Sequence, residues 1–319
     1  MKKKILIITG DPNSINSELI FKTWKKLNRK IKKKIIFISN YNLLKEQFKK
    51  LKYKTKIINL KNIQYISSED SLKILNVNLK FKNPFKVDRN QASNFFYTSL
   101  KIAHKLALKK DISGIITCPI SKHILNKKKI GVTEVLALKS KIKNNSEVML
   151  IKSKKFAVCP ITTHEDIKNV SRKLNKQLIL NKIKTIDKWF KLKFKKKPKI
   201  GILGLNPHNA ELRKNSEEKR IIIPSILKIK KLGINITGPL VADALFIKDY
   251  KNYDVVVGMY HDQVLIPFKS IFKYKAINLT LGLKYLRVSP DHGVAQNLIG
   301  KNKANPTSLI ECINFINNS

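Results

Sequence analysis

The segment Lys4–Pro12, KILIITGDP, places an apolar run directly before a polar loop that contains a glycine. The run is apolar at successive positions rather than at alternate ones, which is typical of a strand buried on both faces of a parallel sheet. It ends at Asp11, too early for the roughly 7–15-residue apolar region of a secretory signal peptide. We therefore interpret Lys4–Thr9 as the first buried strand.

Similar short runs recur along the chain and alternate with helix-like stretches. The predicted strands are Lys34–Ser39, Lys56–Leu60, Gly114–Cys118, Glu147–Ile151, Phe156–Ile161, Lys199–Leu203, Asp254–Met259 and Tyr274–Asn278. The predicted helices are Ser17–Leu27, Asn42–Leu51, Gln91–Lys109, Asp166–Phe190 and Glu217–Leu232. This alternation predicts an α/β protein with a mostly parallel sheet covered by helices on both faces.

The composition limits the classes of protein to which the chain can belong. The chain has 319 residues, enough for one large or two ordinary domains, and 43% of them are hydrophobic, as in a globular protein. No apolar run approaches the roughly 18 residues of a membrane span. The three cysteines form no CxxC pair, which argues against a disulfide framework and a thiolate zinc site. We expect a soluble protein of the reducing cytoplasm.

The charge is strongly positive, with 66 Lys and Arg against 21 Asp and Glu, a net of +45. Such a charge suggests a nucleic-acid or membrane partner. The lysines, however, are spread over the whole length and greatly outnumber arginine, the usual reader of bases. We therefore expect solvated lysines and no dedicated nucleic-acid or membrane surface, and we keep a basic nucleic-acid-binding protein as the weaker alternative.

Polar clusters follow five of the predicted strands, at the end where ligands bind in open α/β sheets. Three of these clusters contain a histidine: His164, His208 and His261. Their separations of 44 and 53 residues exclude a motif on one helix, but three strand-end loops can bring three imidazoles together. Three neutral nitrogens would leave one coordination position of a metal open for substrate. Neighbouring carboxylates that could orient the rings are Asp166, Glu211 and Asp262.

The clusters also form an ordered set of motifs: TTHED, GLNPHNAE, GPLVADALF, MYHDQVLIPFK, NLTLGL and RVSPDHGVA. In this order and spacing they resemble the 4-hydroxythreonine-4-phosphate dehydrogenase family of pyridoxal phosphate biosynthesis, over essentially the whole chain. The resemblance implies two α/β/α domains like those of isocitrate and isopropylmalate dehydrogenases. It also implies a homodimer with a shared active site, a divalent metal, and NAD or NADP as oxidant.

For the domains we expect residues 1–136 with 285–319 in the first and 137–284 in the second. The second would carry most metal and substrate loops, and the active site would lie between the domains and at the dimer interface. Zinc is the metal that three imidazoles favour, with magnesium, cobalt and manganese as alternatives. No GxGxxG or P-loop motif identifies the cofactor site, and NAD cannot be told from NADP.

The resemblance carries over to individual residues. His164, His208 and His261 match the metal ligands, which the family shares between dimer partners. The positions that match substrate-binding residues are Thr133, Lys269, Asn278 and Arg287. Lys269 and Asp243 are the candidates for moving the hydroxyl proton. Our candidates for cofactor binding are Asn206, Pro207 and His292.

The implied reaction oxidises 4-phosphooxy-L-threonine with NAD or NADP, and the resulting β-keto acid loses carbon dioxide to give 3-amino-2-oxopropyl phosphate. Three departures from the family bear on it. The first loop is GDPNSINSE instead of GDPAGIGPE, the GHTE motif is GVTE with Val132, and DHGTA is DHGVA with Val294. Val132 cannot donate a hydrogen bond to substrate. The alternatives are therefore a threonate or erythronate 4-phosphate dehydrogenase and an enzyme with weakened catalysis.

Overall fold

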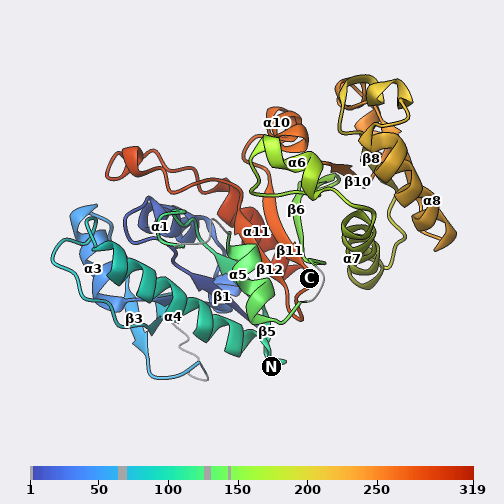
Figure 1. Cartoon of the computed structure of the whole chain (residues 1–319). Helices are drawn as coiled ribbons and strands as arrows, with labels where there is room; N and C mark the ends of the chain where they lie inside the picture. The colour runs from blue at the N-terminus through green and yellow to red at the C-terminus, as the bar shows by residue number, and fades with distance from the viewer. Residues whose placement is uncertain (1–2, 64–69, 126–130, 143–144) are drawn as a thin grey trace. The chain divides into compact units, whose positions relative to one another are not determined.

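The chain divides into two compact units, coloured by residue number in Figure 1. The computed structural model describes residues 3–63, 70–125, 131–142 and 145–319. The first unit comprises Met1–Lys129 and Lys284–Ser319, and the second comprises Ile130–Leu283. The division expected after residue 136 falls inside helix α5 (Val132–Lys139), which belongs as a whole to the second unit.

The sheet of the first unit is built from buried strands. They are β1 (Lys4–Ile8), β2 (Ile35–Ser39), β3 (Ile57–Leu60), β4 (Leu72–Asn76), β5 (Ile112–Thr117) and β12 (Arg287–Pro290). Their order is β3-β4-β2-β1-β5-β12, and the described pairings between them are parallel. Every position of β2 is buried, as is every position of β1 after Lys4. A strand buried throughout is covered on both faces, which confirms the layering predicted from KILIITGDP.

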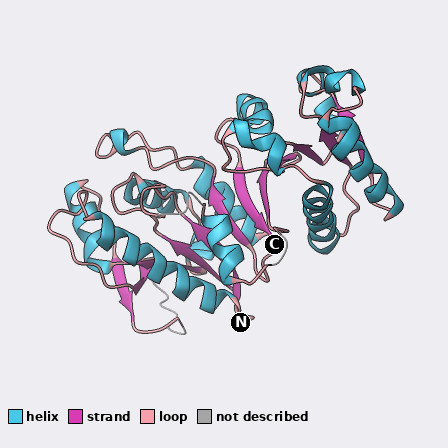
Figure 2. Ribbon diagram, in the orientation of Figure 1, coloured by secondary structure: helices cyan, strands magenta, loops and turns pink. Residues whose placement is uncertain are grey.

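Side-chain caps begin three of the described helices of the first unit, among them two of its longer ones. Its helices are α1 (Asn16–Lys26), α2 (Arg29–Lys32), α3 (Tyr41–Lys50), α4 (Arg89–Ala107), α11 (Thr307–Asn317) and the 3₁₀ turn η4 (Gln296–Leu298). The Asp88 carboxylate accepts two backbone N–H groups at the start of α4, and Asn40 accepts one at the start of α3. Helix α4 packs against β1, β2 and β5, and α11 packs against β1, β5 and β12 (Figure 2).

The sheet of the second unit is mostly parallel but contains one reversed strand. Its strands are β6 (Val148–Lys152), β7 (Ala157–Pro160), β8 (Ile200–Leu203), β9 (Ile236–Leu240), β10 (Val255–Gly258) and β11 (Ile277–Leu281), in the order β11-β6-β7-β10-β8-β9. Strands β7, β10, β8 and β9 pair in parallel, whereas β6 is antiparallel to β7 and β11. Only residues 153–156 connect β6 to β7, and a parallel crossover needs about a dozen residues or more. The predicted mostly parallel α/β fold is confirmed.

The helices of the second unit differ from the prediction in several places, and α5 is among those that were not predicted. They are α5, α6 (Ile167–Lys173), α7 (Lys176–Phe194), α8 (Ile223–Lys231), α9 (Ala242–Leu245) and α10 (His261–Phe272), with the shorter turns η1 (Pro207–Leu212), η2 (Glu218–Ile222) and η3 (Asp249–Asn252). The single helix predicted over Asp166–Phe190 is wrong, because Asn175 is extended and caps a new helix through Leu178 N–H at 2.8 Å. The sequence pattern also does not predict α10, whose first residues are polar and which contains Pro267.

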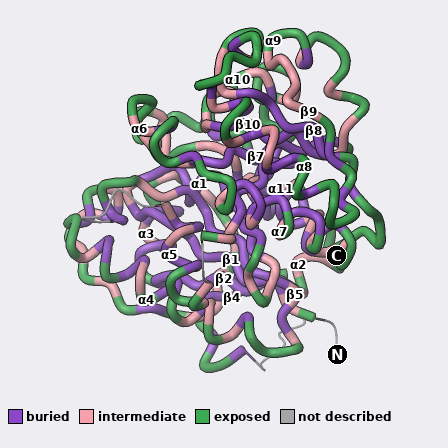
Figure 3. The backbone as a smooth tube through the Cα atoms, turned by 45° about the vertical axis from the view of Figure 1, so that its right-hand side comes forward, coloured by how far each residue is buried: buried purple, intermediate pink, exposed green. Residues whose placement is uncertain are grey.

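The core of the second unit fixes helix α10 against the sheet. Val264, Leu265 and Phe268 of α10 are buried in a cluster with residues of β6, β7, β8 and β10. Phe268 is fully buried, and its ring centroid lies 6.0 Å from that of Phe156 and 4.7 Å from that of Phe272. Figure 3 shows the purple, buried strands on which this packing depends. The packing holds the first residue of α10, His261, at the end of β10.

Among the residues that the model describes, no helix combines the length and the apolar character needed to cross a bilayer. The three cysteines, Cys118, Cys159 and Cys312, are free and buried. Burial raises the pKa of the Cys118 thiol to about 12, so this thiol keeps its proton at neutral pH.

Replacing Phe268 by Ala should lower the free energy of unfolding by about 3–5 kcal/mol, because a fully buried ring leaves a cavity. Phe272→Ala is the matched control, since Phe272 lies on the same helix and in the same cluster but is only partly buried. Phe272→Ala should lower the free energy of unfolding by clearly less than Phe268→Ala does. Urea titrations followed by the fluorescence of Trp189 in the second unit measure both, and equal losses would contradict the anchoring role of Phe268.

Candidate active site

The loop that follows β7 carries His164 and is fastened to the end of β10. Both the backbone N–H and the hydroxyl of Thr162 donate to the carbonyl oxygen of Met259, at 3.1 and 2.8 Å. Because β7 and β10 are parallel neighbours, their following residues leave the sheet at the same edge. The rings of His164 and His261 therefore lie close together, with centroids 6.4 Å apart.

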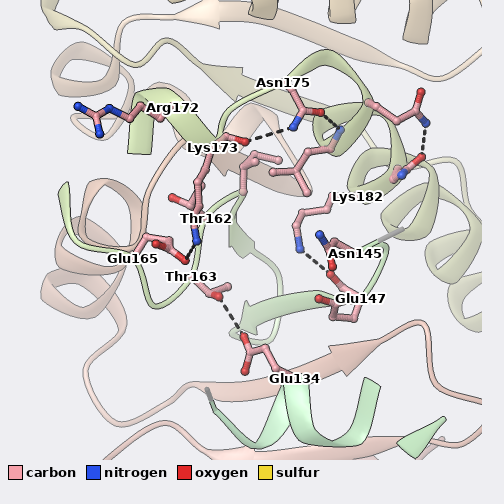
Figure 4. Close-up of a pocket in the computed structure, with 14 residues that line it drawn as sticks. Glu134, Asn145, Glu147, Thr162, Thr163, Glu165, Arg172, Lys173, Asn175 and Lys182 are labelled. Carbon is pink, nitrogen blue, oxygen red and sulfur yellow. Dashed lines mark hydrogen bonds and ion pairs between the residues drawn. The ribbon is translucent and has the colours of Figure 1, made fainter. Parts of the chain in front are cut away.

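A carboxylate lies behind His164. The Nδ1 atom of His164 is 3.5 Å from Oε1 of Glu134. The Thr163 hydroxyl donates to the same oxygen at 3.0 Å, as the dashed line in Figure 4 shows. Burial by itself would raise the pKa of Glu134, but the hydrogen bonds and charge of His164, with the other donors, outweigh it and lower the pKa to about 2. Glu134 is therefore ionised at neutral pH and can orient the His164 ring.

Gly131 lets Glu134 and His164 come together. Its N–H donates to the other oxygen of Glu134, Oε2, at 2.9 Å, at the start of helix α5. A Cβ atom on Gly131 would lie 2.7 Å from Cε1 of His164, closer than real Cβ contacts allow. A side chain at this position would displace the histidine ring.

His261 is the first residue of α10, and it also has a carboxylate beside it. Its Nδ1 atom is 2.6 Å from Oδ1 of Asp262. Two residues along, Gln263 accepts the N–H of Met259 and donates to the carbonyl oxygen of Gly204, both at 2.7 Å. The Gln263 side chain thus joins the loop after β8 to the loop after β10.

His208 lies on a left-handed backbone turn in the loop after β8. All five residues from His208 to Leu212 have positive φ angles, between 44° and 56°. This conformation costs roughly 1–2 kcal/mol per residue for L-amino acids. Such strain persists only where the surroundings hold it, and it is characteristic of functional sites.

The buried Glu218 holds the start of this turn. One oxygen of its carboxylate accepts the N–H groups of Leu205 and Asn206, each at 2.8 Å, and the other accepts the Asn206 amide at 3.1 Å. Further along, the Asn209 amide donates to the carbonyl oxygen of Pro239 at 3.0 Å. Burial would raise the pKa of Glu218, but the hydrogen bonds from Asn206 and Leu205 outweigh it and lower the pKa. The charged carboxylate is therefore part of the fold of this loop.

The residues at this edge fit a divalent metal ion in type. Two imidazole side chains, His164 and His261, lie close together, and each has a carboxylate beside it, as histidine ligands of zinc do. Within the described part of the chain, however, no three His, Cys, Asp or Glu side chains gather closely enough to hold an ion. One chain thus pairs two of the three predicted ligands, and the site that includes His208 stays a prediction.

Two predicted substrate residues of the second unit lie at one face of β11: Asn278 is part of this strand, and Thr133 contacts it from α5. Thr133 is buried on α5, and its hydroxyl oxygen lies 3.0 Å from that of Thr280. Asn278 stands two residues before Thr280, so both side chains point to the same face of the strand. Lys269, in the last turn of α10, and Asp243, in α9, are exposed.

Two other predicted residues belong to the first unit. Arg287 is buried at the start of β12, and its guanidinium donates to the hydroxyl of Thr117 at the end of β5. His292 is half-buried, with Nδ1 3.1 Å from the carbonyl oxygen of Gly293. The remaining cofactor candidates, Asn206 and Pro207, lie in the loop after β8 of the second unit.

A family model described as pyridoxal phosphate biosynthetic protein PdxA matches residues 30–316, most of the chain. The chain belongs to the PdxA family. A relative from Sulfurihydrogenibium sp., a 4-hydroxythreonine-4-phosphate dehydrogenase, is 38% identical over 317 residues, which cover 97% of this chain and 96% of the relative. This confirms the resemblance stated from the motifs, and the PdxA chain is an enzyme of a dehydrogenase family.

Two further similarities extend over almost the whole PdxA chain. A relative from Oceanobacillus iheyensis, named for D-threonate 4-phosphate dehydrogenase activity, is 33% identical over 330 residues, covering 98% of this chain and 96% of the relative. The solved structure of a 4-hydroxythreonine-4-phosphate dehydrogenase from Klebsiella pneumoniae has a TM-score of 0.86 at 27% identity, covering 99% of this chain and 98% of that one.

The altered first loop of this PdxA protein adopts its conformation without the missing glycines. Gly10 has a φ of +74°, but no residue from Asp11 to Glu18 has a positive φ. The Asn16 amide donates to the carbonyl oxygens of Thr9 and Pro119 at 2.9 and 2.7 Å. Side-chain hydrogen bonds thus hold the loop where the family motif has small residues. The loss of the glycines therefore leaves no left-handed backbone residue between Asp11 and Glu18.

Three structural side chains of the site were not singled out from the sequence: Glu134, Glu218 and Gln263. Glu134 and Gln263 lie inside the GVTE and YHDQ motifs. Their place in a motif is the one feature of the sequence that could have indicated a role in the site. Glu218 lies outside the quoted motifs, and only its burial beside the loop after β8 identifies it. Val132, the departure in GVTE, is buried at the first position of α5.

Replacing Glu218 by Gln should lower the free energy of unfolding by about 1–3 kcal/mol, because the amide keeps one acceptor but turns a donor toward the Asn206 amide. Since the pKa of Glu218 is lowered on folding, its stabilisation is present above the unfolded pKa, near 4.5, and is lost as pH falls through the lower folded value. The difference between wild type and variant in urea titrations should therefore shrink in acid.

The control for this substitution is Glu217→Gln. Glu217 is only half-buried and accepts two side-chain bonds, from Asn206 at 2.9 Å and from the Ser171 hydroxyl, but no backbone N–H of the loop, so its loss should cost less. A Glu218→Gln effect that stays constant from neutral to acid pH would contradict the role given to the charge.

Proposed function

We propose that this protein is a 4-hydroxythreonine-4-phosphate dehydrogenase that acts in the cytoplasm as a homodimer. It would oxidise the secondary alcohol of 4-phosphooxy-L-threonine with NAD or NADP, and the β-keto acid would then lose carbon dioxide to give 3-amino-2-oxopropyl phosphate. The observation that carries the proposal is the pairing of His164 with His261 at the ends of two parallel strands, each beside a carboxylate. The whole-length similarity to a dehydrogenase of this name supports the choice of substrate.

His164 and His261 would hold a divalent metal, with zinc favoured over magnesium, cobalt and manganese by imidazole ligands. We propose that His208 comes to the same ion from a second copy of the chain. When bound, the metal supplies a Lewis acid that stabilises negative charge on the reacting oxygen. Glu134, ionised and bonded to Thr163, would keep the His164 ring in the orientation that ligation requires.

The remaining residues would bind the substrate and move its proton. Lys269 and Arg287 provide positive charge for the carboxylate and phosphate, and Arg suits a bidentate contact. Asn278 and Thr133 would donate or accept hydrogen bonds. The proton of the substrate hydroxyl would pass to Asp243, or to Lys269 where that side chain enters the reaction as the neutral amine, while the hydride passes to the nicotinamide.

A second candidate is a dehydrogenase of a 4-phosphorylated sugar acid, threonate or erythronate. Two observations favour it. Val132 is apolar and buried at the first position of α5, next to Thr133, where the family motif has a histidine. A relative named for D-threonate 4-phosphate dehydrogenase is similar over almost the whole chain. These substrates carry a hydroxyl group where 4-phosphooxy-threonine carries an amino group.

Purified protein loaded with Zn²⁺ should reduce NAD or NADP when 4-phosphooxy-L-threonine is added, as measured by the absorbance of the reduced cofactor. His208→Ala should abolish both turnover and bound metal without unfolding the chain. His104→Ala is the matched control, because His104 lies on α4 and bonds the Tyr285 hydroxyl at 2.7 Å within the first unit. The His104→Ala variant should keep both turnover and bound metal.

Two results would contradict this proposal. Absence of turnover with 4-phosphooxy-threonine and with the sugar-acid phosphates would reject the enzyme assignment. Elemental analysis that finds full metal occupancy in His208→Ala would reject the ligand role of His208.

The Val132→His variant separates the two substrate classes. Restoring a polar contact of about 1–3 kcal/mol should raise kcat/KM for 4-phosphooxy-threonine by roughly one to two powers of ten. Val132→Leu is the control, since it stays apolar and should leave the preference between substrates unchanged. If wild type already prefers 4-phosphooxy-threonine and the histidine adds nothing, Val132 does not limit substrate choice.

A further inference from the structure

The second unit contains a pocket of about 560 Å³ that the proposed reaction does not use. Its walls come from the segments before β7, β8 and β10, and from the end of α7. Its cationic residues are Lys152, Lys154, Lys155, Lys196, Lys199 and Lys251. We refer to it below as the lysine pocket.

The lysine pocket lies at the edge of the sheet opposite to the histidines. It is lined by residues 152–155, 196–199 and 251–254, which precede β7, β8 and β10. His164, His208 and His261 follow the same three parallel strands. A four-residue strand spans roughly 13 Å at about 3.3 Å per residue, so a ligand here would not touch the histidine site.

Lys152 is a buried cation built into the wall of this pocket. Only 8% of the residue is exposed, and its Nζ donates to the carbonyl oxygens of Ser153 and Lys154 at 2.7 and 2.9 Å. Nζ also lies 5.5 Å from the centre of the Phe194 ring. Burial lowers the pKa of Lys152 to about 8, against the opposing effect of Asp254. A bound anion would offset the cost of this buried charge.

The acid of the lysine pocket is already paired. Asp254 is the one acidic residue among those that line it, all of which the structure describes. One of its oxygens is 2.6 Å from Nζ of Lys196, and the other accepts the N–H of Lys199 at 2.9 Å. Six lysines against one aspartate leave an excess of five positive charges in a small recess. Such an excess attracts multivalent anions.

Aromatic rings form the apolar part of the lysine pocket. Phe190 and Phe194 at the end of α7 have ring centroids 5.3 Å apart, and Tyr253 lines the pocket beside them. Phe190 is buried, whereas 39% of Phe194 is exposed. An exposed ring next to lysines offers a surface on which the flat base of a ligand can stack.

We propose that the lysine pocket binds a small molecule that carries a diphosphate group. Lysine ammonium groups bind phosphate as mobile point charges, and the volume lies within the range of small-molecule sites, about 300–1,000 Å³. A single phosphate would leave most of the positive charge uncompensated, whereas a diphosphate reaches several lysines at once. Both inorganic diphosphate and a nucleoside diphosphate carry this group.

Isothermal titration calorimetry of the full chain with inorganic diphosphate, ADP and orthophosphate tests the proposal at a fixed salt concentration. Diphosphate and ADP should bind at least tenfold more tightly than orthophosphate. The double variant Lys199→Gln/Lys251→Gln changes two exposed lysines of the pocket and should weaken binding by about tenfold or more, the effect of losing one charge-assisted contact. Lys152→Gln should weaken it as well, with folding checked by circular dichroism.

The control Lys228→Gln/Lys230→Gln removes the same charge from exposed positions of α8 outside the lysine pocket. It should change the dissociation constants by less than about twofold. Absence of binding heat, equal loss in the control, or equal affinity for orthophosphate would overturn the proposal.

Comparison of the two diphosphates identifies what is recognised. Equal affinity for ADP and inorganic diphosphate supports recognition of the diphosphate alone. Tighter binding of ADP, lost in Phe194→Ala, supports stacking of the base on Phe194 as well. Binding that the lysine-pocket variants weaken belongs to this pocket, whereas binding that they leave unchanged belongs to the site of the proposed dehydrogenase, so the two proposals fail separately.

Discussion

Parallel pairing of β7, β10 and β8 is the constraint on which the second unit depends. Parallel strands send every following loop to one edge of the sheet and every preceding segment to the other. His164 and His261 therefore lie together at one edge, with ring centroids 6.4 Å apart. The lysines gather at the opposite edge for the same reason. One topological rule thus separates the proposed metal site from the proposed anion site within a single sheet.

Carboxylate side chains at the edge of this sheet stabilise the conformations of two loops by accepting hydrogen bonds from them. Glu218 compensates the buried N–H groups of Leu205 and Asn206, and the five left-handed residues that begin at His208 follow directly. In the same way, the Glu134 carboxylate lies beside Nδ1 of His164 and can orient its ring. The hydrogen bonds that hold these loops thus also lower the pKa of Glu134 and of Glu218.

The sequence predicts the parts of the molecule that rest on local pattern. Buried strands such as Ile5–Ile8 are apolar throughout, and the approach of His164 to His261 follows from their positions after strands. Helix α10 escapes prediction because its first turn is polar and tertiary packing of Phe268 stabilises it. The roles of Glu218 and Gln263 depend on contacts over 13 and 59 residues of sequence separation, which no local pattern encodes.

The first loop shows how a longer side chain can change the surface that a loop presents. At Gly10 a Cβ atom would lie 2.7 Å from the Asn16 amide, so this amide fills the space above the glycine backbone. A loop of small residues leaves its main chain open for a ligand to rest against. Here the Asn16 amide covers the main chain at Gly10. A molecule that binds at this position would therefore contact the side chain of Asn16 rather than the backbone.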